Sequence, residues 1–273
     1  MNCKICNSVV HKIAEQLILQ KHNISYYQCP NCLLIQTEEP YWLQEAYGNV
    51  ITKLDIGIIS RNLFLKEQIP LIIDAFFPES KIMVDYGGGY GLFVRMMRDM
   101  GYNFYRQDIY CENLFAKYFD VSDIDILKFD ILTAFEVFEH LALPLPEIEK
   151  MFALSDNIIF TTEIAHEDIS DFKAWWYVSP MTGQHISFYN IKTLQFIADK
   201  FGKHFYSNGH NIHLFVNKNL NNVIVKKVFN NQMESKLERI KQIIFLTQNK
   251  VVSKQSLLQE DYKFIEKIIL NNA

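Results

Sequence analysis

The stretch Val84-Asp85-Tyr86-Gly87-Gly88-Gly89-Tyr90-Gly91 decides the fold class, because it contains the pattern D-x-G-x-G-x-G. An apolar segment, residues 81–85, leads into it, and a helix-forming segment from Leu92 to Met100 follows. Glycines let the backbone turn tightly here and let a ligand approach without a Cβ in the way. The following helix offers a ligand its free N–H groups and the positive end of its dipole. We therefore predict a strand, a ligand-binding turn and a helix, in this order.

The segments around this turn alternate between predicted strands and helices. Apolar runs predict strands over 104–108, 130–135, 157–162, 205–206 and 212–216, and helical spacing predicts helices over 54–76 and 191–202. Pro70 is expected to kink or break the first of these helices. Strands that alternate with helices predict an α/β fold with a mostly parallel sheet.

Two carboxylates accompany the glycines. Asp108 ends the next predicted strand, 17 residues beyond Gly91, where a carboxylate can bind both hydroxyls of a ribose. Asp85 lies two residues before the first glycine, where it can reach an ammonium group. A dinucleotide has a pyrophosphate and no ammonium group, and its usual turn is G-x-G-x-x-G. The pattern therefore favours S-adenosylmethionine over a dinucleotide.

Length and composition are those of an ordinary globular protein. The chain has 273 residues, of which 49% are apolar and 21% charged, and a formal net charge of −4. These values exclude a disordered or collagen-like chain. No apolar run approaches the roughly 18 residues that span a bilayer, and residues 1–6 do not begin a signal peptide. We expect a cytoplasmic protein without a transmembrane segment.

The charge is unevenly distributed along the chain. Residues 1–217 carry 17 basic and 26 acidic side chains, whereas residues 218–273 carry 10 basic and 5 acidic ones. The acidic body disfavours a nucleic-acid partner. Apolar residues recur at helical spacing over 223–270 and predict helices that pack on the body. The alternatives for this tail are a contact in a homo-oligomer and a basic cover over an anionic substrate.

Four of the five cysteines predict a metal site. Cys3 and Cys6 form one C-x-x-C pair, and Cys29 and Cys32 form a second pair after 22 intervening residues. Zn²⁺ prefers four thiolates in tetrahedral geometry, and in a reducing compartment this spacing favours metal over a disulfide. We predict a structural Zn²⁺ in an N-terminal zinc ribbon, with redox or incidental cysteines as the alternative. The expected domains are a ribbon over 1–40, a cofactor-binding domain over 41–217 and a helical tail over 218–273.

The glycine turn resembles motif I of the class I S-adenosylmethionine-dependent methyltransferases. Asp108 matches the ribose-binding acid of that family, and residues 135–141, FEVFEHL, match its fourth-strand motif. Residues 175–189 resemble a subgroup that also has an N-terminal zinc ribbon and is often linked to the modification of sugars in bacterial surface polysaccharides. The resemblance covers roughly residues 1–216.

This resemblance implies a Rossmann-like sheet of seven strands with its last strand antiparallel. The third strand is expected within 123–127, although these residues lack a clear adenine-contacting pattern. The cofactor-binding residues that the resemblance implies are Asp85, Tyr86, Gly87, Gly89, Gly91, Asp108, Phe135 and Glu136.

A group of acidic residues and histidines follows the strand predicted over 130–135. The spacing E-x-x-E-H can place Glu136, Glu139 and His140 around one point at the ligand-binding edge of the sheet, with His185 on a later loop. This set suits a divalent cation such as Mg²⁺, Mn²⁺ or Zn²⁺. It also resembles the metal site of small-RNA 3′-end 2′-O-methyltransferases and of some ubiquinone-biosynthesis O-methyltransferases. Without metal, His185 suits a general base that Glu139 and His140 support.

These features predict S-adenosylmethionine-dependent methyl transfer to a sugar hydroxyl or sugar carbon of a nucleotide sugar or surface glycan. The catalytic candidates are His185, His140 and Glu139. A first alternative is a metal-dependent O-methyltransferase that acts on an RNA 2′-hydroxyl or on a small-molecule hydroxyl. A second alternative is a non-catalytic interaction module, which the intact glycines and both cofactor acids disfavour.

Overall fold

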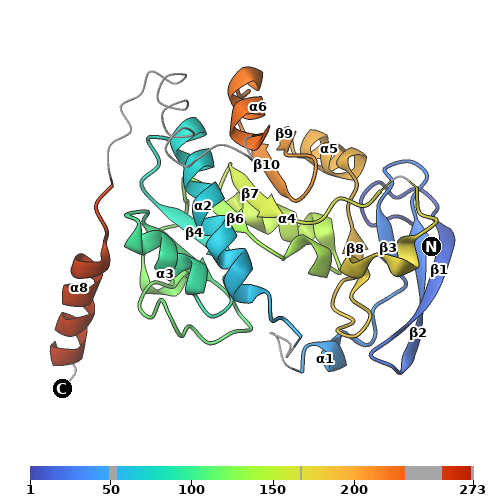
Figure 1. Ribbon diagram of the computed structural model, residues 1–273, viewed down its shortest axis with the longest axis horizontal. Helices are drawn as coiled ribbons and strands as arrows, with labels where there is room; N and C mark the ends of the chain where they lie inside the picture. Colours follow the sequence, from blue (N-terminus) through green and yellow to red (C-terminus); the bar gives the residue numbers. More distant parts are fainter. Residues whose placement is uncertain (49–53, 167, 231–253, 272–273) are drawn as a thin grey trace. The chain divides into compact units, whose positions relative to one another are not determined.

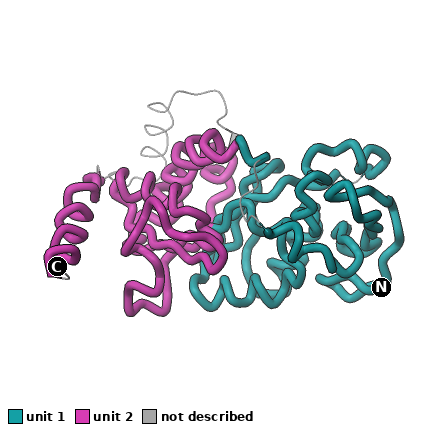
Figure 2. Tube along the Cα trace, turned by 90° about the horizontal axis from the view of Figure 1, so that it is seen from below, with its two compact units in different colours: residues 1–56, 134–219 teal, residues 57–133, 220–273 magenta. Residues whose placement is uncertain are grey.

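The structure, a computed structural model, describes residues 1–48, 54–166, 168–230 and 254–271 (Figure 1). The chain divides into two compact units (Figure 2). Unit 1 comprises residues 1–56 and 134–219, and unit 2 comprises residues 57–133 and 220–273. Part of the helix predicted in the tail lies outside the described residues, including Leu237, Ile240, Ile243 and Ile244.

Unit 2 contains the strand, turn and helix predicted around the glycines. Strand β4 (Met83–Tyr86) pairs in parallel with β5 (Phe104–Gln107) on one side and with β6 (Ile131–Ala134) on the other. Apolar side chains bury β4 on both faces, as is usual for the middle strand of a parallel sheet. Helix α3 (Leu92–Asp99) starts directly after the turn, with Gly91 in the left-handed conformation as its N-cap. The predicted order of strand, turn and helix is confirmed.

Helix α2 (Ile58–Phe76) continues through Pro70, so of the two predicted effects of this proline, a kink or a break, the break does not occur. The ring of Pro70 is buried, as are the neighbouring side chains of Ile69 and Leu71. Burial of this apolar face outweighs the missing backbone hydrogen bond, since each fully buried apolar side chain contributes about 1.5–3 kcal/mol.

The end of the tail is held against unit 2 by buried charges. Helix α6 (Asn222–Asn230) and helix α8 (Leu258–Asn271) confirm two parts of the helical prediction. Asp261 of α8 is buried and forms ion pairs with Arg95 (2.8 Å) and Arg98 (2.7 Å) of α3. The helix therefore packs on the body, as expected for the tail.

The third strand expected within 123–127 is absent. A short 3-10 helix, η1 (Val121–Asp123), occupies the start of this segment and no strand follows it before β6. Asp120 and Asp123 form a capping box at η1, so their side chains bond to backbone N–H groups that a strand would use otherwise. A single parallel bridge between Arg106 and Asp120 replaces the strand pairing.

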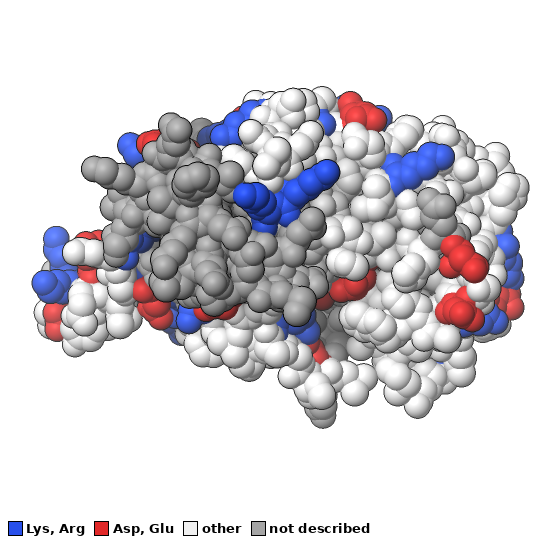
Figure 3. Space-filling model, turned by 45° about the horizontal axis from the view of Figure 1, so that its top comes forward, with Lys and Arg blue, Asp and Glu red and all other residues white. Residues whose placement is uncertain are grey.

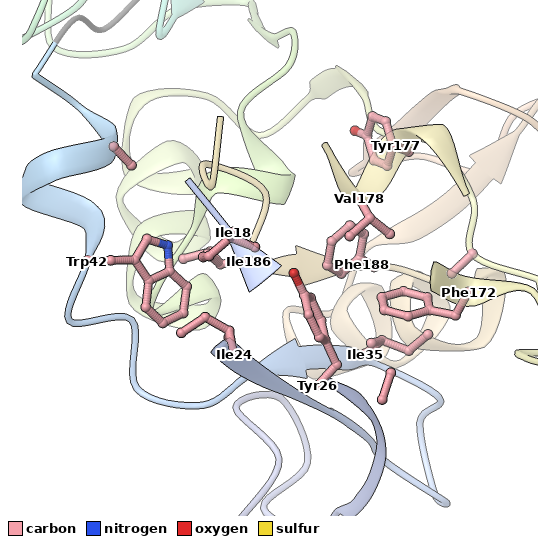
Figure 4. Close-up of a cluster of buried hydrophobic side chains, with 13 residues drawn as sticks. Ile18, Ile24, Tyr26, Ile35, Trp42, Phe172, Tyr177, Val178, Ile186 and Phe188 are labelled. Carbon is pink, nitrogen blue, oxygen red and sulfur yellow. The ribbon is translucent and has the colours of Figure 1, made fainter. Parts of the chain in front are cut away.

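The N-terminal part of unit 1 is an antiparallel sheet in the order β1-β2-β3-β8. It consists of β1 (His11–Ile18), β2 (His22–Gln28), β3 (Ile35–Thr37) and the later strand β8 (Ser187–Phe188). A cluster of buried side chains covers this sheet, and Figure 4 shows Tyr26 and Ile35 from the ribbon among Phe172 and Phe188 from the later segment. The two segments thus share one hydrophobic core although about 150 residues separate them.

The remaining elements of unit 1 follow the predicted order. Strand β10 (Ile212–Val216) pairs antiparallel with β7 (Ile158–Thr161) and with β9 (His204–Ser207), so the expectation of an antiparallel last strand is confirmed. The strand order β5-β4-β6-β7-β10-β9 gives a mixed six-stranded sheet and confirms the α/β fold. The helical elements are α1 (Leu43–Ala46), η2 (Phe138–His140), α4 (Pro144–Leu154), η3 (Phe172–Ala174), η4 (Trp176–Val178) and α5 (Ile191–Lys200). None of the helices in the described residues is long and apolar enough to cross a membrane.

Candidate active site

The glycine turn of unit 2 has a backbone that only glycine adopts easily. Gly87, Gly89 and Gly91 have φ angles of 70°, 53° and 83°, in the left-handed region. Gly88 has little free space, since a Cβ there would lie 2.8 Å from Cγ of Arg106. The turn therefore presents bare backbone after β4, as a cofactor that approaches closely requires.

Substitution of Gly91 by alanine is expected to destabilise unit 2 by about 2–4 kcal/mol, because backbone strain adds to a steric clash. The new Cβ would lie 2.8 Å from Oδ1 of Asn113 and 3.1 Å from Cβ of Ala116. Gly202→Ala is the matched control, since Gly202 has a φ of 63° and no atom within 4 Å of an added Cβ. Chemical denaturation of both variants measures the difference, and equal losses would contradict the packing argument.

Asp108 ties the glycine turn to the loop after β5. Its Oδ2 accepts a hydrogen bond from the amide of Gly89 (2.9 Å). Its Oδ1 accepts from the amides of Tyr110 and Cys111, both at 2.7 Å. A carboxylate offers about four lone-pair directions, so one remains for a ligand hydroxyl.

Arg106 is bonded to the same two segments, the glycine turn and the loop after β5. Its buried guanidinium donates to the carbonyl oxygens of Gly89 (2.5 Å) and Cys111 (2.9 Å), and Nε donates to Asp120 (2.6 Å). Such charge-assisted bonds are stronger than neutral ones. The arginine was not singled out in the sequence, because its role depends on loops that only the fold brings together.

Asp85 lies buried at the end of β4. Thr133 of β6 donates a hydrogen bond to Asp85 Oδ1 (2.6 Å). Burial raises the pKa of Asp85 to about 7, and the charge of Asp108 adds to this shift, whereas Thr133 and Arg106 oppose it. A cationic ligand group would be a natural partner for this carboxylate, because it would stabilise the charged form.

The raised pKa of Asp85 predicts a pH-dependent contribution to stability. The folded-state pKa lies above the value of 3.8 for an unburied aspartate, so the folded state holds the proton more tightly. The stabilisation is fully present below about pH 4 and is lost as the pH rises through about 7, up to about 4 kcal/mol. Denaturation curves of the parent and Asp85→Asn should diverge over this interval, and parallel curves would refute the shift.

Unit 1 brings together three of the four predicted acid and histidine residues. One ligand atom each from Glu139, His140 and His185 lies within 4.8 Å of the others. His140 Nε2 is 3.9 Å from Oε1 of Glu139, and the two imidazole rings lie 4.9 Å apart in an edge-to-face arrangement. Glu139 and His140 belong to η2. His185 lies two residues before β8, and Ile186 separates it from the strand.

The carboxyl group of Glu139 is an unusual buried group. It is fully buried, and neither oxygen has a hydrogen-bond partner among the described residues. Burial raises its pKa well above the usual value, and the nearby charge of Glu136 adds to the shift. Weaker contacts with the hydroxyls of Tyr177 and Thr162 oppose the shift without offsetting it. A buried carboxyl without a hydrogen-bond partner destabilises the protein, which makes a functional reason for it worth testing.

Backbone carbonyl groups orient both histidines. His140 Nδ1 lies 3.1 Å from the carbonyl oxygen of Gln184, and His185 Nδ1 lies 2.5 Å from that of Tyr177. A carbonyl only accepts hydrogen bonds, so these contacts place the ring proton on Nδ1 and the lone pair on Nε2. Sequence reasoning missed Tyr177 as a partner, because its carbonyl belongs to η4 and the contact depends on how η4 lies against the His185 loop.

Glu136 does not join the ligand atoms of this group. Its φ of 54° is left-handed, its amide donates to Oγ1 of Thr161, and its Oε1 accepts from the same hydroxyl (both 2.9 Å). The expectation that both glutamates point at one site was therefore wrong for Glu136. Phe135 precedes it in unit 1 after β6, and Tyr86 ends β4 in unit 2.

The four N-terminal cysteines form a compact sulfur cluster in unit 1. Sγ of Cys3 lies 3.4 Å from that of Cys32, and Sγ of Cys6 lies 3.3 Å from that of Cys29. All four sulfur atoms lie within 4.8 Å of one another, and none forms a disulfide. Hydrogen bonding with the Cys32 thiol lowers the pKa of Cys3 to about 5. Four thiols in this arrangement fit a tetrahedral Zn²⁺.

A comparison with protein families identifies the chain. The model of a family described as "Methyltransferase domain" matches residues 61–204, which is more than half of the chain. The chain belongs to this methyltransferase domain family. The match includes the glycine turn, Asp108 and all three residues of the acid–histidine cluster Glu139, His140 and His185. It leaves out the four cysteines of the ribbon and the tail.

Solved structures resemble this methyltransferase domain at low identity. An O-methyltransferase family protein from Burkholderia thailandensis is 9% identical (TM-score 0.42, 66% of this chain and 63% of that chain). A mitomycin 7-O-methyltransferase is 13% identical (TM-score 0.39, 64% and 60%). The plantazolicin methyltransferase in complex with SAH is 9% identical (TM-score 0.44, 75% and 90%). The chain spans less than two thirds of the first two structures, and a search of curated proteins gives no match.

Proposed function

We propose that this chain transfers a methyl group from S-adenosylmethionine to a hydroxyl, or to a carbon, of a sugar in a nucleotide sugar or surface glycan. The observation that carries the cofactor assignment is the glycine turn of unit 2, with two carboxylates beside bare backbone. Membership in the methyltransferase domain family supports it. The sugar acceptor and the zinc-ribbon subgroup rest on the sequence resemblance.

The residues of unit 2 fit the groups of this cofactor. In the proposal, Asp85 binds the ammonium group of the cofactor, and the glycine turn leaves room for the cofactor beside its backbone. Asp108 accepts a hydrogen bond from a ribose hydroxyl through its remaining lone pair. In the proposal, Asp108 therefore binds one ribose hydroxyl instead of the two that the sequence predicted. When bound, S-adenosylmethionine supplies a methyl group that its sulfonium already activates.

The residues of unit 1 fit proton removal from an acceptor hydroxyl. His185 is the proposed general base, because its Nδ1 proton is held by the Tyr177 carbonyl and Nε2 carries the lone pair. His140 is oriented in the same way, and the carboxyl group of Glu139, whose pKa burial raises, lies beside it. Deprotonation makes the acceptor oxygen nucleophilic, and Glu139 and His140 support the base.

Calorimetry with S-adenosylmethionine tests the cofactor assignment. Micromolar binding is expected for the parent, and Asp108→Ala should weaken it about 10- to 100-fold, because a charged hydrogen bond and the loop that it fixes are lost. Asp99→Ala is the control, since Asp99 is exposed and forms an ion pair with Arg95 of the same helix. Absence of binding would refute the proposal and favour the non-catalytic interaction module.

A divalent cation at Glu139, His140 and His185 is the second candidate. The specific observation is the unpartnered carboxyl group of Glu139 beside two imidazoles whose Nδ1 protons bond to carbonyls. Metal-binding histidines commonly donate their second ring N–H in this way. Such a cation would lower the pKa of the acceptor hydroxyl, and His185 would then be a ligand and not the base.

Titration with Mn²⁺ separates the two candidates. A cation site predicts binding that Glu139→Gln abolishes and Glu136→Gln preserves, since Glu136 is held by Thr161. It also predicts that EDTA stops methyl transfer and Mn²⁺ restores it. Activity that survives EDTA would leave His185 as the base.

The remaining expectations for partners are part of the proposal. We favour a small molecule or glycan over nucleic acid, because residues 1–217 carry 26 acidic and 17 basic side chains. Figure 3 shows charged side chains of both signs among the described residues of one face. We also propose a cytoplasmic location, where the thiols of the ribbon stay reduced, and cell fractionation can test it. A homo-oligomer through the C-terminal helices is a further proposal, which light scattering can test.

A further inference from the structure

The N-terminal segment of unit 1 holds the loop that carries His185. Trp42 donates from Nε1 to the carbonyl of Gly183 (2.8 Å), and the side chain of Gln184 donates to the carbonyl of Ala46 (3.0 Å). Trp42 is almost completely buried, so its hydrogen bond is shielded from water. Both residues before His185 are thus bound to the segment 42–46.

Strand pairing holds the other side of the same loop. The amide of Thr37 donates to the carbonyl of Ile186 (3.1 Å). Strand β3 also pairs antiparallel with β8, with Gln36 opposite Ser187. Figure 4 shows Trp42 and Ile35 in the same buried cluster as Ile186 and Phe188. His185 therefore lies between two points at which the N-terminal segment of unit 1 is bonded to the backbone of its loop.

Tyr47 reaches the second histidine of the cluster. Its hydroxyl lies 3.1 Å from Nδ1 of His140, and the two rings contact edge to face. Because the Gln184 carbonyl already requires a proton on this nitrogen, the Tyr47 oxygen is a second acceptor for it. Tyr47 thus favours the ring orientation that turns Nε2 towards Glu139.

The second cysteine pair is connected directly to strand β3. The amide of Cys29 donates to the carbonyl of Leu34 (2.9 Å), one residue before β3 begins. The carbonyl of Cys32 accepts a hydrogen bond from Oγ1 of Thr193 (2.6 Å) in helix α5. The second cysteine pair is thus hydrogen-bonded to the residue before β3 and to helix α5.

We propose that the N-terminal segment of unit 1, residues 1–48, is part of the active site, with Tyr47 as a positioning residue for His140 and with metal at the four cysteines controlling the order of the His185 loop. The proposal rests on the proposed function of the acid–histidine cluster. It gives the ribbon a role beyond stabilising itself. Metal removal should consequently lower methyl transfer while cofactor binding persists.

Hydrogen exchange of the full-length protein tests the coupling without an activity assay. Amide exchange is compared between the Zn²⁺-loaded protein, the protein after a chelator, and the protein after Zn²⁺ is returned. We expect the amides of Thr37 and Ile186 to exchange at least about tenfold faster without metal and to recover with it, while amides of β4 stay unchanged. Unchanged exchange at Ile186 after metal loss would overturn the proposal.

Tyr47→Phe tests the positioning role without touching the metal. It removes one acceptor and keeps the ring, so kcat should fall about 3- to 10-fold, with KM for S-adenosylmethionine and the melting temperature nearly unchanged. Tyr41→Phe is the matched control, because Tyr41 is exposed on the same segment. Equal kcat values for both variants would show that Tyr47 does not act on His140.

The two readouts distinguish this proposal from the proposed function. A loaded protein that binds no cofactor and transfers no methyl group would refute the function, while hydrogen exchange would still report the coupling. Normal methyl transfer by a metal-stripped protein would refute the coupling alone.

Discussion

His185→Ala is expected to lower kcat about 10²- to 10⁴-fold, the range for loss of a general base. The affinity for S-adenosylmethionine should not change, because His185 is not among the residues that are proposed to bind the cofactor. Single-turnover assays under saturating cofactor measure the rate, and calorimetry measures the affinity.

Two further variants make this result specific. His185→Gln keeps a hydrogen-bond donor for the Tyr177 carbonyl but cannot act as a base, so it should be as inactive as the alanine variant. His204→Ala replaces an exposed histidine at the start of β9 and should retain the parent rate. An active glutamine variant would mean that His185 only holds the loop.

Cys32→Ser is expected to abolish binding of Zn²⁺ at the ribbon and to lower the stability of the ribbon by more than about 5 kcal/mol. Structural zinc sites contribute about 10–16 kcal/mol of apparent folding free energy in small domains, and loss of one thiolate removes much of it. Cys32 is also fully buried, so the ribbon cannot replace its sulfur with water easily. Metal analysis and thermal unfolding measure both effects.

Cys111→Ser is the matched control for this substitution. Cys111 lies in unit 2, outside the sulfur cluster, and burial raises the pKa of its thiol to about 11. Its replacement should change the stability by less than about 1 kcal/mol and leave the metal content unchanged. If both serine variants kept Zn²⁺, the four-cysteine site would be refuted.

Local sequence signals predicted the parts of the site that depend on neighbouring residues. The strand β4, the left-handed glycines and helix α3 follow from one short stretch, since glycine geometry and helix capping act over a few residues. The C-x-x-C pairs predicted the sulfur cluster because each pair forms its own tight turn. The spacing E-x-x-E-H correctly placed Glu139 beside His140, but it could not show that Thr161 on β7 holds Glu136 elsewhere.

The sequence by itself determined the α/β fold class, the glycine turn and the cluster of four cysteines that could hold a metal ion, because residue type and short spacing specify each of them. Only the tertiary structure decided that Pro70 stays inside a helix. It also decided that a capped 3-10 helix begins after Asp120, where a strand was predicted nearby. It also decided that Trp42 and Tyr47 belong to the surroundings of His185 and His140. The physical reason is that burial and hydrogen bonds between distant segments outweigh local propensity. A local sequence pattern cannot predict which distant segments will contact each other.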